Sequence, residues 1–313
     1  NWQNTQHNWQ INKEDIYIIN GVVPAYSACI EAFSEENDEV IVQTPIYPPL
    51  FKCVNANNRK VVVNELKKDE NGYYTMDLED LEKKITSKTK ILALCSPHNP
   101  VGRVWSKDEL EKLANICIKH NIIIVSDEIH SDITFKKFTP LSSISKEIAN
   151  QTITLNSAGK TFNIAGLNSA YAISKNQDLL NKFKKIAQKR EIQSINFFGY
   201  IATKAAYDNG AIFVEELKKY LLSNINFTKD FFEKNNIKID FGIPEATYLL
   251  WLDFSKINLS HEEIKELLLR KAKIALNDGV SFGNNGNKYF RLNCALSKKA
   301  LNTALIQLSN NLM

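Results

Sequence analysis

A chain of 313 residues and 35.6 kDa is long enough for one large domain or two ordinary ones. Its contents of 44% hydrophobic and 24% charged residues are ordinary for a globular protein, which excludes a disordered, collagen-like or coiled-coil chain. The net charge of +4 comes from 39 basic and 35 acidic residues that are interleaved, so neither nucleic acid nor a membrane surface is indicated as a partner.

Three patterns bear on where such a chain works. It has no run of about 18 apolar residues, so no membrane-spanning helix is predicted. The five cysteines lie far apart without a C-x-x-C pair, which indicates reduced thiols in a cytoplasmic protein and neither a disulfide framework nor a zinc site. The chain starts with Asn1, and its first ten residues lack a signal-peptide pattern, so we expect it to begin inside a longer protein.

From residue 40 onward, short apolar runs rich in β-branched residues alternate with longer helical patterns. The helix expected from 106 to 120 has Ser106 at its N-cap and Glu109 three residues later, which together form a capping box. Alternation of this kind favours an α/β fold with a mostly parallel central sheet that helices cover on both faces. The predicted strands are 40–42, 60–63, 90–94, 122–125, 152–155 and 169–173.

The pattern changes after residue 175. Helices are expected over 176–190, 212–235 and 260–273, and strands over 237–239, 247–252 and 289–293. We therefore expect a large domain over residues 1–221 and a smaller α+β domain over 222–313. Because ligands of an open parallel sheet bind beyond the carboxyl ends of its strands, the segments that follow the strands are the candidates for function.

Two candidate segments flank the first strand of this series. Gly21, Val22 and Val23 precede a helical stretch; glycine lets the backbone approach a ligand, and the N–H groups at a helix start suit a phosphate. Neither a G-x-G-x-x-G nor a Walker pattern supports that interpretation. Tyr47 follows strand 40–42, where stacking on a ligand and simple packing are equally compatible with the sequence.

The next two strands are followed by polar residues. Asn99 stands before Pro100, which keeps it out of the helical region, so its amide can point at a ligand; a rigid turn is the alternative. Asp127 follows a fully apolar strand, and a buried carboxylate takes up a proton unless a cation faces it. A cationic ring nitrogen of a cofactor would serve. Pairing with a lysine, or a metal site shared with His130 and Asp132, are the alternatives.

The last two candidates are cationic. Lys160 lies among small residues after strand 152–155, beside Ser157, and a desolvated lysine can act as a nucleophile that forms an imine. Most lysines, however, are merely solvated surface groups. Arg291 lies inside a predicted strand of a chain with only five arginines, which suggests bidentate binding of a carboxylate; a structural ion pair is the alternative.

In this order the segments resemble the fold-type I pyridoxal-phosphate (PLP) enzymes of aminotransferase class I/II. More narrowly they resemble the MalY/PatB branch of C–S β-lyases, also called cystathionine β-lyases. The resemblance covers nearly the whole chain. The motifs that carry it are GVVPA (21–25), TPIYPP (44–49), SPHNPVGRVW (96–105), SDEIHSD (126–132), KTFNIAGL (160–167), PEATYLLWLDF (244–254), NDGVSFG (277–283) and FRLN (290–293).

The resemblance implies a role for each candidate. Lys160 matches the lysine that binds the cofactor covalently and moves the Cα proton of the substrate. Asp127 matches the aspartate that keeps the pyridine nitrogen protonated, and Arg291 matches the arginine that binds the α-carboxylate. The remaining matches are Asn99 to the ring hydroxyl, Tyr47 to the ring face, and Gly21, Val22, Val23 and Ser157 to the phosphate.

The resemblance also implies an activity. The expectation is a cytoplasmic, homodimeric C–S β-lyase that cleaves cystathionine or cysteine-type thioethers to thiol, pyruvate and ammonia, without a metal. A class I/II aminotransferase would use the same residues, and a non-catalytic PLP-fold protein is a further alternative. An NAD-dependent dehydrogenase would need a glycine fingerprint that the chain lacks.

Three features depart from the family pattern. Many relatives that transfer amino groups have tyrosine where His130 stands, which favours the lyase branch. Relatives have roughly seventy residues before the point where this chain starts, including a tyrosine that reaches the phosphate of the neighbouring subunit. Lys288 stands where relatives often have a small residue, and the sequence suggests no role for it.

Overall fold

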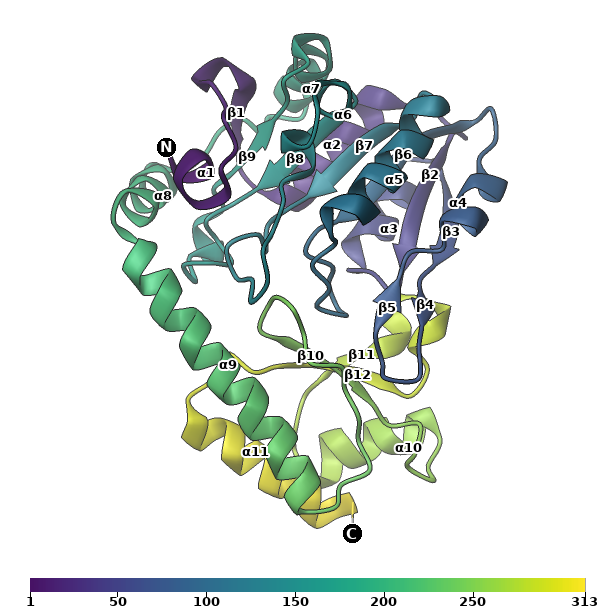
Figure 1. Cartoon of the computed structure of the whole chain (residues 1–313), viewed down its shortest axis with the longest axis vertical. Coiled ribbons are helices and arrows are strands. Elements are labelled where there is room, and N and C mark those ends of the chain that lie inside the picture. The colour runs from purple at the N-terminus through teal and green to yellow at the C-terminus, as the bar shows by residue number, and fades with distance from the viewer. Residues whose placement is uncertain (313) are drawn as a thin grey trace.

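A seven-stranded sheet forms the centre of the larger, upper lobe of the molecule (Figure 1). The computed structural model describes residues 1–312. The strand order is β1-β9-β8-β7-β6-β2-β3, and the pairs from β8 through β3 are parallel. β9 runs antiparallel to both of its neighbours. The strands are β1 (Ile16–Ile19), β2 (Glu39–Thr44), β3 (Lys60–Glu65), β6 (Thr89–Cys95), β7 (Ile123–Asp127), β8 (Thr152–Asn156) and β9 (Ala170–Ile173).

Helices cover both faces of this sheet because its strands are apolar on both sides. In β2, Val40 and Val42 enter one hydrophobic cluster and Ile41 enters the other, as the alternation of side chains along a strand requires. The first cluster includes α2 (Val22–Phe33), α3 (Pro49–Ala56) and α7 (Gln177–Lys189), and the second includes α4 (Leu78–Lys84), α5 (Lys107–Lys119) and α6 (Lys146–Asn150).

The lower lobe has a core of its own, built on the antiparallel sheet β10-β12-β11. The long helix α9 runs from one lobe to the other (Figure 1), so the boundary predicted at residue 222 falls inside it and stays a prediction. The elements of this lobe are α9 (Ala211–Lys234), β10 (Leu249–Asp253), α10 (His261–Glu266), a π-helical turn (Leu267–Lys271), β11 (Asn277–Asp278), β12 (Tyr289–Asn293) and α11 (Lys298–Leu312).

Smaller elements complete the fold. The hairpin β4–β5 extends from the upper lobe toward the small sheet (Figure 1). No helix within residues 1–312 is both long and apolar enough to cross a bilayer. The smaller elements are α1 (Trp2–His7), β4 (Lys67–Lys68), β5 (Tyr74–Thr75), α8 (Phe197–Asn209) and the 3-10 helices Lys13–Asp15, Leu141–Ser143, Ala165–Leu167, Gly279–Phe282 and Asn284–Gly286.

The expected α/β fold with a mostly parallel sheet is confirmed, as are the six strands of the large lobe. Ser106 and Glu109 form the predicted capping box at the start of α5. The strand predicted over 237–239 is wrong. Ile237 and Ile239 pack into the core of the lower lobe, and the only pairing nearby is an isolated bridge from Asp240.

Gly102 lies in contact with the 244–246 segment of the lower lobe. Its φ of +71° is a left-handed conformation, and a Cβ placed on it would lie 2.5 Å from the Cβ of Pro244 in the lower lobe. Its carbonyl accepts hydrogen bonds from the N–H groups of Glu245 and Ala246, at 2.8 and 3.0 Å. Both the backbone conformation and the lack of space therefore require glycine here.

We expect Gly102→Ala to lower the free energy of unfolding by about 2–4 kcal/mol, because it adds backbone strain to a clash with Pro244. Denaturant titration would measure the loss. Gly166→Ala is the matched control, since nothing lies within 4 Å of a Cβ at that glycine, and it should leave stability nearly unchanged. Equal stability of both variants would contradict the close packing of the lobes at this point.

Candidate active site

A cavity of about 370 Å³ lies between the lobes, at the carboxyl ends of the parallel strands. Its upper wall comes from the start of α2 and from the segments after β2, β6, β7 and β8, and its lower wall from the small sheet. The cavity brings together every site residue predicted from the sequence, which are Gly21, Val22, Val23, Tyr47, Asn99, Asp127, Ser157, Lys160 and Arg291.

Asp127 is the last residue of β7, and only 6% of it is exposed. Its carboxylate accepts one backbone hydrogen bond, from Ile129 at 3.2 Å. Burial raises the pKa of Asp127 to about 6, against the lowering effects of that bond and of the Lys160 charge. A carboxylate held in this way favours a cation brought into the cavity by a ligand.

The turn that carries Lys160 follows β8 and is held at both ends. Before the lysine, the Ser157 hydroxyl donates to the carbonyl of Ser169 at 2.6 Å and accepts from Gly159 N–H at 2.9 Å. After the lysine, the Thr161 hydroxyl donates to the buried carboxylate of Asp132 at 2.9 Å. These bonds fix the backbone around a half-buried amine that lines the cavity.

The Asp132 carboxylate is engaged by side chains of the fold. Its carboxylate accepts hydrogen bonds from Trp2 Nε1 and Thr161 and also contacts His7 Nε2, all between 2.7 and 2.9 Å. Within residues 1–312, no group of three His, Cys, Asp or Glu side chains is placed to hold a metal ion. The metal alternative for Asp127 and His130 therefore has no support from the geometry.

The start of α2 opens on the cavity. Gly21 is its N-cap and provides no side-chain cap, so the first N–H groups of the helix have no side-chain acceptor at the cap. Free N–H groups and the positive end of the helix dipole favour an anion at this position. A phosphate group would meet that requirement.

Arg291 provides the positive charge of the lower wall. It donates to two uncharged amide oxygens, Asn99 Oδ1 at 2.7 Å and Asn277 Oδ1 at 2.9 Å, and its guanidinium lies over the Phe282 ring at 4.9 Å. Its Nε is buried and has no partner. Burial lowers the pKa of Arg291, although the group stays cationic. Because no carboxylate within residues 1–312 pairs with it, the arrangement suits an incoming carboxylate.

His130 lines the same cavity as Lys160 and Arg291 and is 4% exposed. Burial, together with the charges of Lys160 and Arg291, lowers its pKa to about 3, so the ring is neutral. Its Nδ1 has no partner, and its ring meets Tyr248 edge to face at 5.9 Å between centroids. A neutral ring here adds no third positive charge.

The cavity can therefore hold a ligand with a cationic ring, a phosphate and a carboxylate, next to an amine. A family model described as "Aminotransferase class I and II" matches residues 1–308. The chain belongs to this family. Its fold and the order of its motifs are those that the sequence led us to expect.

Relatives within the family include both named lyases and solved structures. The chain is 38% identical to cystathionine beta-lyase PatB of Bacillus subtilis and 30% identical to protein MalY of Escherichia coli, over 97% and 99% of this chain and 79% of each relative. It is 35% identical to cystalysin of Treponema denticola, with a TM-score of 0.97 over 99% of this chain and 79% of that one. The cystalysin crystal structure contains a pyridoxal 5'-phosphate cofactor.

Sequence reasoning missed four residues of the lower wall, Tyr248, Leu249, Asn277 and Asn293. Tyr248 lies in a motif that supported the family resemblance, but nothing in the sequence places it near His130. Asn277 reaches Arg291 because β11 and β12 pair antiparallel with these two residues in register. The backbone explains why small residues suit position 288. Lys288 has a φ of +60°, a left-handed conformation, and its N–H donates to His261 Nδ1 at 3.0 Å. The structure gives no reason for a lysine at this position.

The raised pKa of Asp127 makes a prediction about the cofactor-free protein. The folded state favours the protonated acid, so stability falls as pH rises from about 4 to about 6, and above that range the full cost of ionisation stays constant. We expect Asp127→Asn to raise the free energy of unfolding by up to about 3 kcal/mol at pH 8 and to give little change at pH 4.

Denaturant unfolding at the two pH values would test this. Asp230→Asn, on the exposed side of α9, is the control and should show no such pH dependence. A loss of stability at pH 8 in Asp127→Asn would mean that a cation inside the protein already compensates the carboxylate.

Proposed function

We propose that this protein is a PLP-dependent C–S β-lyase that cleaves cystathionine or cysteine-type thioethers to thiol, pyruvate and ammonia. The observation that carries the proposal is the single cavity that holds Lys160, Asp127 and Arg291 together. The identity to relatives named cystathionine beta-lyase supports the lyase branch within the family.

The residues present fit the cofactor. Asp127 is a buried carboxylate without a full cationic partner, which suits a protonated ring nitrogen. The uncapped start of α2 at Gly21 suits the phosphate, as do the N–H groups of Val22 and Val23. Tyr47 and Asn99 also line the cavity, where Tyr47 would face the ring and Asn99 would bind its hydroxyl. Ser157 can join the phosphate contacts if its hydroxyl turns away from Ser169.

When bound, PLP supplies an electron sink that stabilises negative charge at the substrate Cα. Arg291 would bind the α-carboxylate and so fix the orientation of the Cα–H bond. The amine of Lys160 would bind the cofactor aldehyde, and later accept the Cα proton. Asp127 would hold the proton on the ring nitrogen, because separating the two charges inside the cavity costs free energy.

The reaction products distinguish a lyase from the alternative functions. A lyase releases pyruvate and free thiol from L-cystathionine without a second substrate. Conversion that depends on a 2-oxo acid and releases no thiol would identify an aminotransferase, which uses the same residues. Failure to bind PLP at all would identify a non-catalytic member of the fold.

Lys160→Ala should abolish pyruvate release from L-cystathionine and remove the absorbance band at about 420 nm expected of a lysine-bound cofactor. Absorption spectroscopy and a coupled pyruvate assay measure the two effects. Lys182→Ala, on the exposed face of α7, should change neither. A retained band in Lys160→Ala would overturn the assignment of this lysine.

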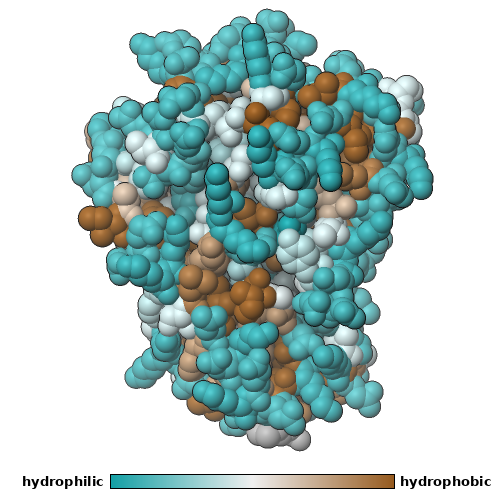
Figure 2. All heavy atoms as spheres, viewed as in Figure 1, coloured by the Kyte–Doolittle hydropathy of each residue, from teal (hydrophilic) through white to brown (hydrophobic). Residues whose placement is uncertain are grey.

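We further propose a homodimer. Large apolar side chains that are 46–79% exposed gather on α8 and on the start of α9, and Figure 2 shows a hydrophobic group at the left edge of the face, among others elsewhere on it. Clusters of this kind mark protein interfaces. The residues are Phe197, Phe198, Tyr200, Ile201, Ile212 and Phe213.

The double variant Phe197→Ser/Phe198→Ser should shift the sedimentation of the protein toward monomer, because two aromatic anchors are lost from the interface. Ile306→Ser, an exposed apolar residue on α11, is the control and should leave sedimentation unchanged. A wild-type protein that sediments as a monomer at high concentration would contradict the dimer itself.

We also propose that the reaction takes place in the cytoplasm. All five cysteines are free, and four of them are buried, which suits a reducing compartment.

We propose, in addition, that residues 222–313 act as a small domain that closes the cavity against the large domain, residues 1–221.

A further inference from the structure

The loop after β6 carries Asn99 at the tip of a tight hairpin. His98 N–H donates to the Arg103 carbonyl at 2.8 Å, and Gly102 N–H donates to the His98 carbonyl at 2.7 Å. The backbone of Arg103 therefore pairs directly with the residue before Asn99. Contacts that hold Arg103 in place therefore also hold the side-chain amide of Asn99, which lines the cavity and accepts a hydrogen bond from Arg291.

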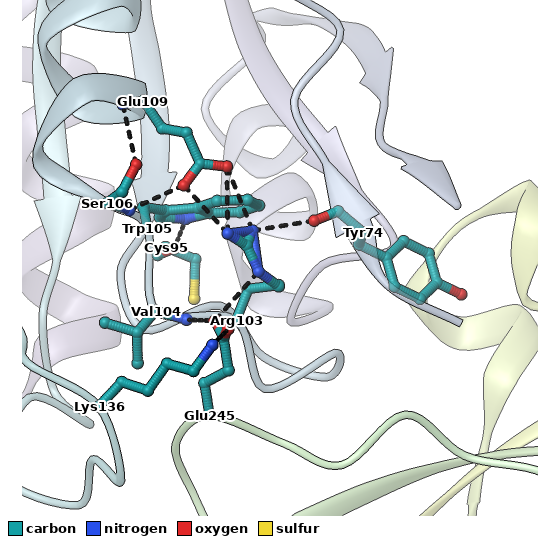
Figure 3. Close-up of polar contacts among 9 residues, drawn as sticks. All are labelled: Tyr74, Cys95, Arg103, Val104, Trp105, Ser106, Glu109, Lys136 and Glu245. Atoms are coloured by element: carbon teal, nitrogen blue, oxygen red, sulfur yellow. Dashed lines mark hydrogen bonds and ion pairs between the residues drawn. The ribbon is translucent and has the colours of Figure 1, made fainter. Parts of the chain in front are cut away.

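The Arg103 side chain is 4% exposed, and each of its three guanidinium nitrogens has an acceptor (Figure 3). Nη1 donates to the Tyr74 carbonyl at 2.9 Å, and Nη2 donates to both carboxylate oxygens of Glu109 at 3.0 and 3.1 Å. Nε donates across the domain junction to Glu245 at 3.1 Å. The guanidinium also stacks on the rings of Tyr73 and Trp105, at 4.1 and 4.6 Å from their centroids.

Glu245 is the matching anchor on the other lobe and is 7% exposed. Its carboxylate accepts from Arg103, from the backbone N–H of Val104 at 3.0 Å and from Lys136 at 2.5 Å (Figure 3). With Glu109, the four side chains carry two positive and two negative charges. Only Arg103 and Glu245 are buried, and the Lys136 side chain is 63% exposed. The buried arginine and glutamate are paired and hydrogen-bonded, which avoids the cost of an unpaired buried charge.

The segment after Glu245 leads directly into the cavity wall. Thr247 N–H donates to the Ile133 carbonyl at 2.8 Å, and Thr247 has a φ of +72°, which is strained for a β-branched residue. Strain of this kind persists only where the surroundings impose it. The next residue, Tyr248, lines the cavity and meets His130 edge to face.

We infer that Arg103 and Glu245 form a positioning pair that sets the substrate wall of the cavity. The pair clamps the turn 244–248 against the Asn99 hairpin, so that Tyr248 and the Asn99–Arg291 contact stand in fixed places. Neither Arg103 nor Glu245 lines the cavity, so both act through other residues. The inference deepens the proposed function and rests on it where substrate affinity is concerned.

Because of where the pair lies, its loss should affect substrate binding and cofactor binding differently. Asp127 and Lys160 lie on β7 and on the turn after β8, and neither makes a hydrogen bond to the pair. Loosening the pair should therefore weaken substrate binding at the lower wall and leave the lysine-bound cofactor in place. A general loss of structure would affect both together.

Arg103→Lys and Glu245→Gln are the test variants. Lysine keeps the charge but cannot reach Glu109, Glu245 and the Tyr74 carbonyl at once. In both variants we expect KM for L-cystathionine to rise at least about fivefold, with a smaller change in kcat and an unchanged band near 420 nm. In the protein without substrate, deuterium uptake of a peptide spanning 245–249 should become faster than in wild type.

Glu31→Gln is the matched control, because Glu31 also shares its carboxylate between an arginine and a lysine, Arg190 and Lys189, but lies away from the cavity. It should change neither KM nor uptake at 245–249. The inference is overturned if Arg103→Lys and Glu245→Gln lower thermal stability while KM and uptake match the control. If wild-type protein cleaves no thioether, the proposed function fails, and uptake at 245–249 alone decides whether the pair holds the turn.

Discussion

The constraint on which the site depends is a carboxylate at the end of an apolar strand. β7 takes Asp127 into the interior, where it accepts one backbone hydrogen bond and its pKa rises to about 6. This burial lowers the stability of the folded protein at neutral pH, and it keeps an acceptor for positive charge in the upper wall of the cavity. A ligand with a cationic ring nitrogen would remove that cost. The buried carboxylate therefore favours binding of such a ligand and keeps its ring nitrogen protonated.

The rest of the cavity distributes charge around that acid. The positive charges come from a lysine after β8, an arginine on β12 and the start of α2, and the imidazole of His130 in the same cavity is neutral. An amino acid bound to a phosphate-bearing cofactor carries negative charge at the carboxylate and the phosphate, so each of these has a separate positive region to meet. Asp127 is the only acidic side chain among the described residues that line the cavity, and it would meet the one part of the ligand that is positive.

Much of this arrangement was predictable, because in a parallel sheet the residues that follow the strands all lie at one edge, where ligands bind. Residues after consecutive strands, such as Tyr47, Asn99, Asp127 and Lys160, reach one edge however far apart they stand in the chain. The rule does not apply to the small antiparallel sheet, where contacts depend on register. The contact between Asn277 and Arg291 depends on register in this way. The sequence pattern also failed at 237–239, where the described chain packs its apolar side chains into the core of the lower lobe and does not pair as a strand.

The arginines show why charge alone does not identify a functional residue. Arg103 and Arg190 both reach carboxylates and make several further hydrogen bonds, so their charges are compensated within the fold. Arg291 donates only to amide oxygens, and its Nε is buried without a partner. Desolvating a cation without compensation costs free energy, and a fold keeps such a group where a ligand supplies the missing anion. The scarcity of arginine in the sequence drew attention to position 291, but it is the unmet hydrogen-bonding capacity there that separates a binding group from a structural one.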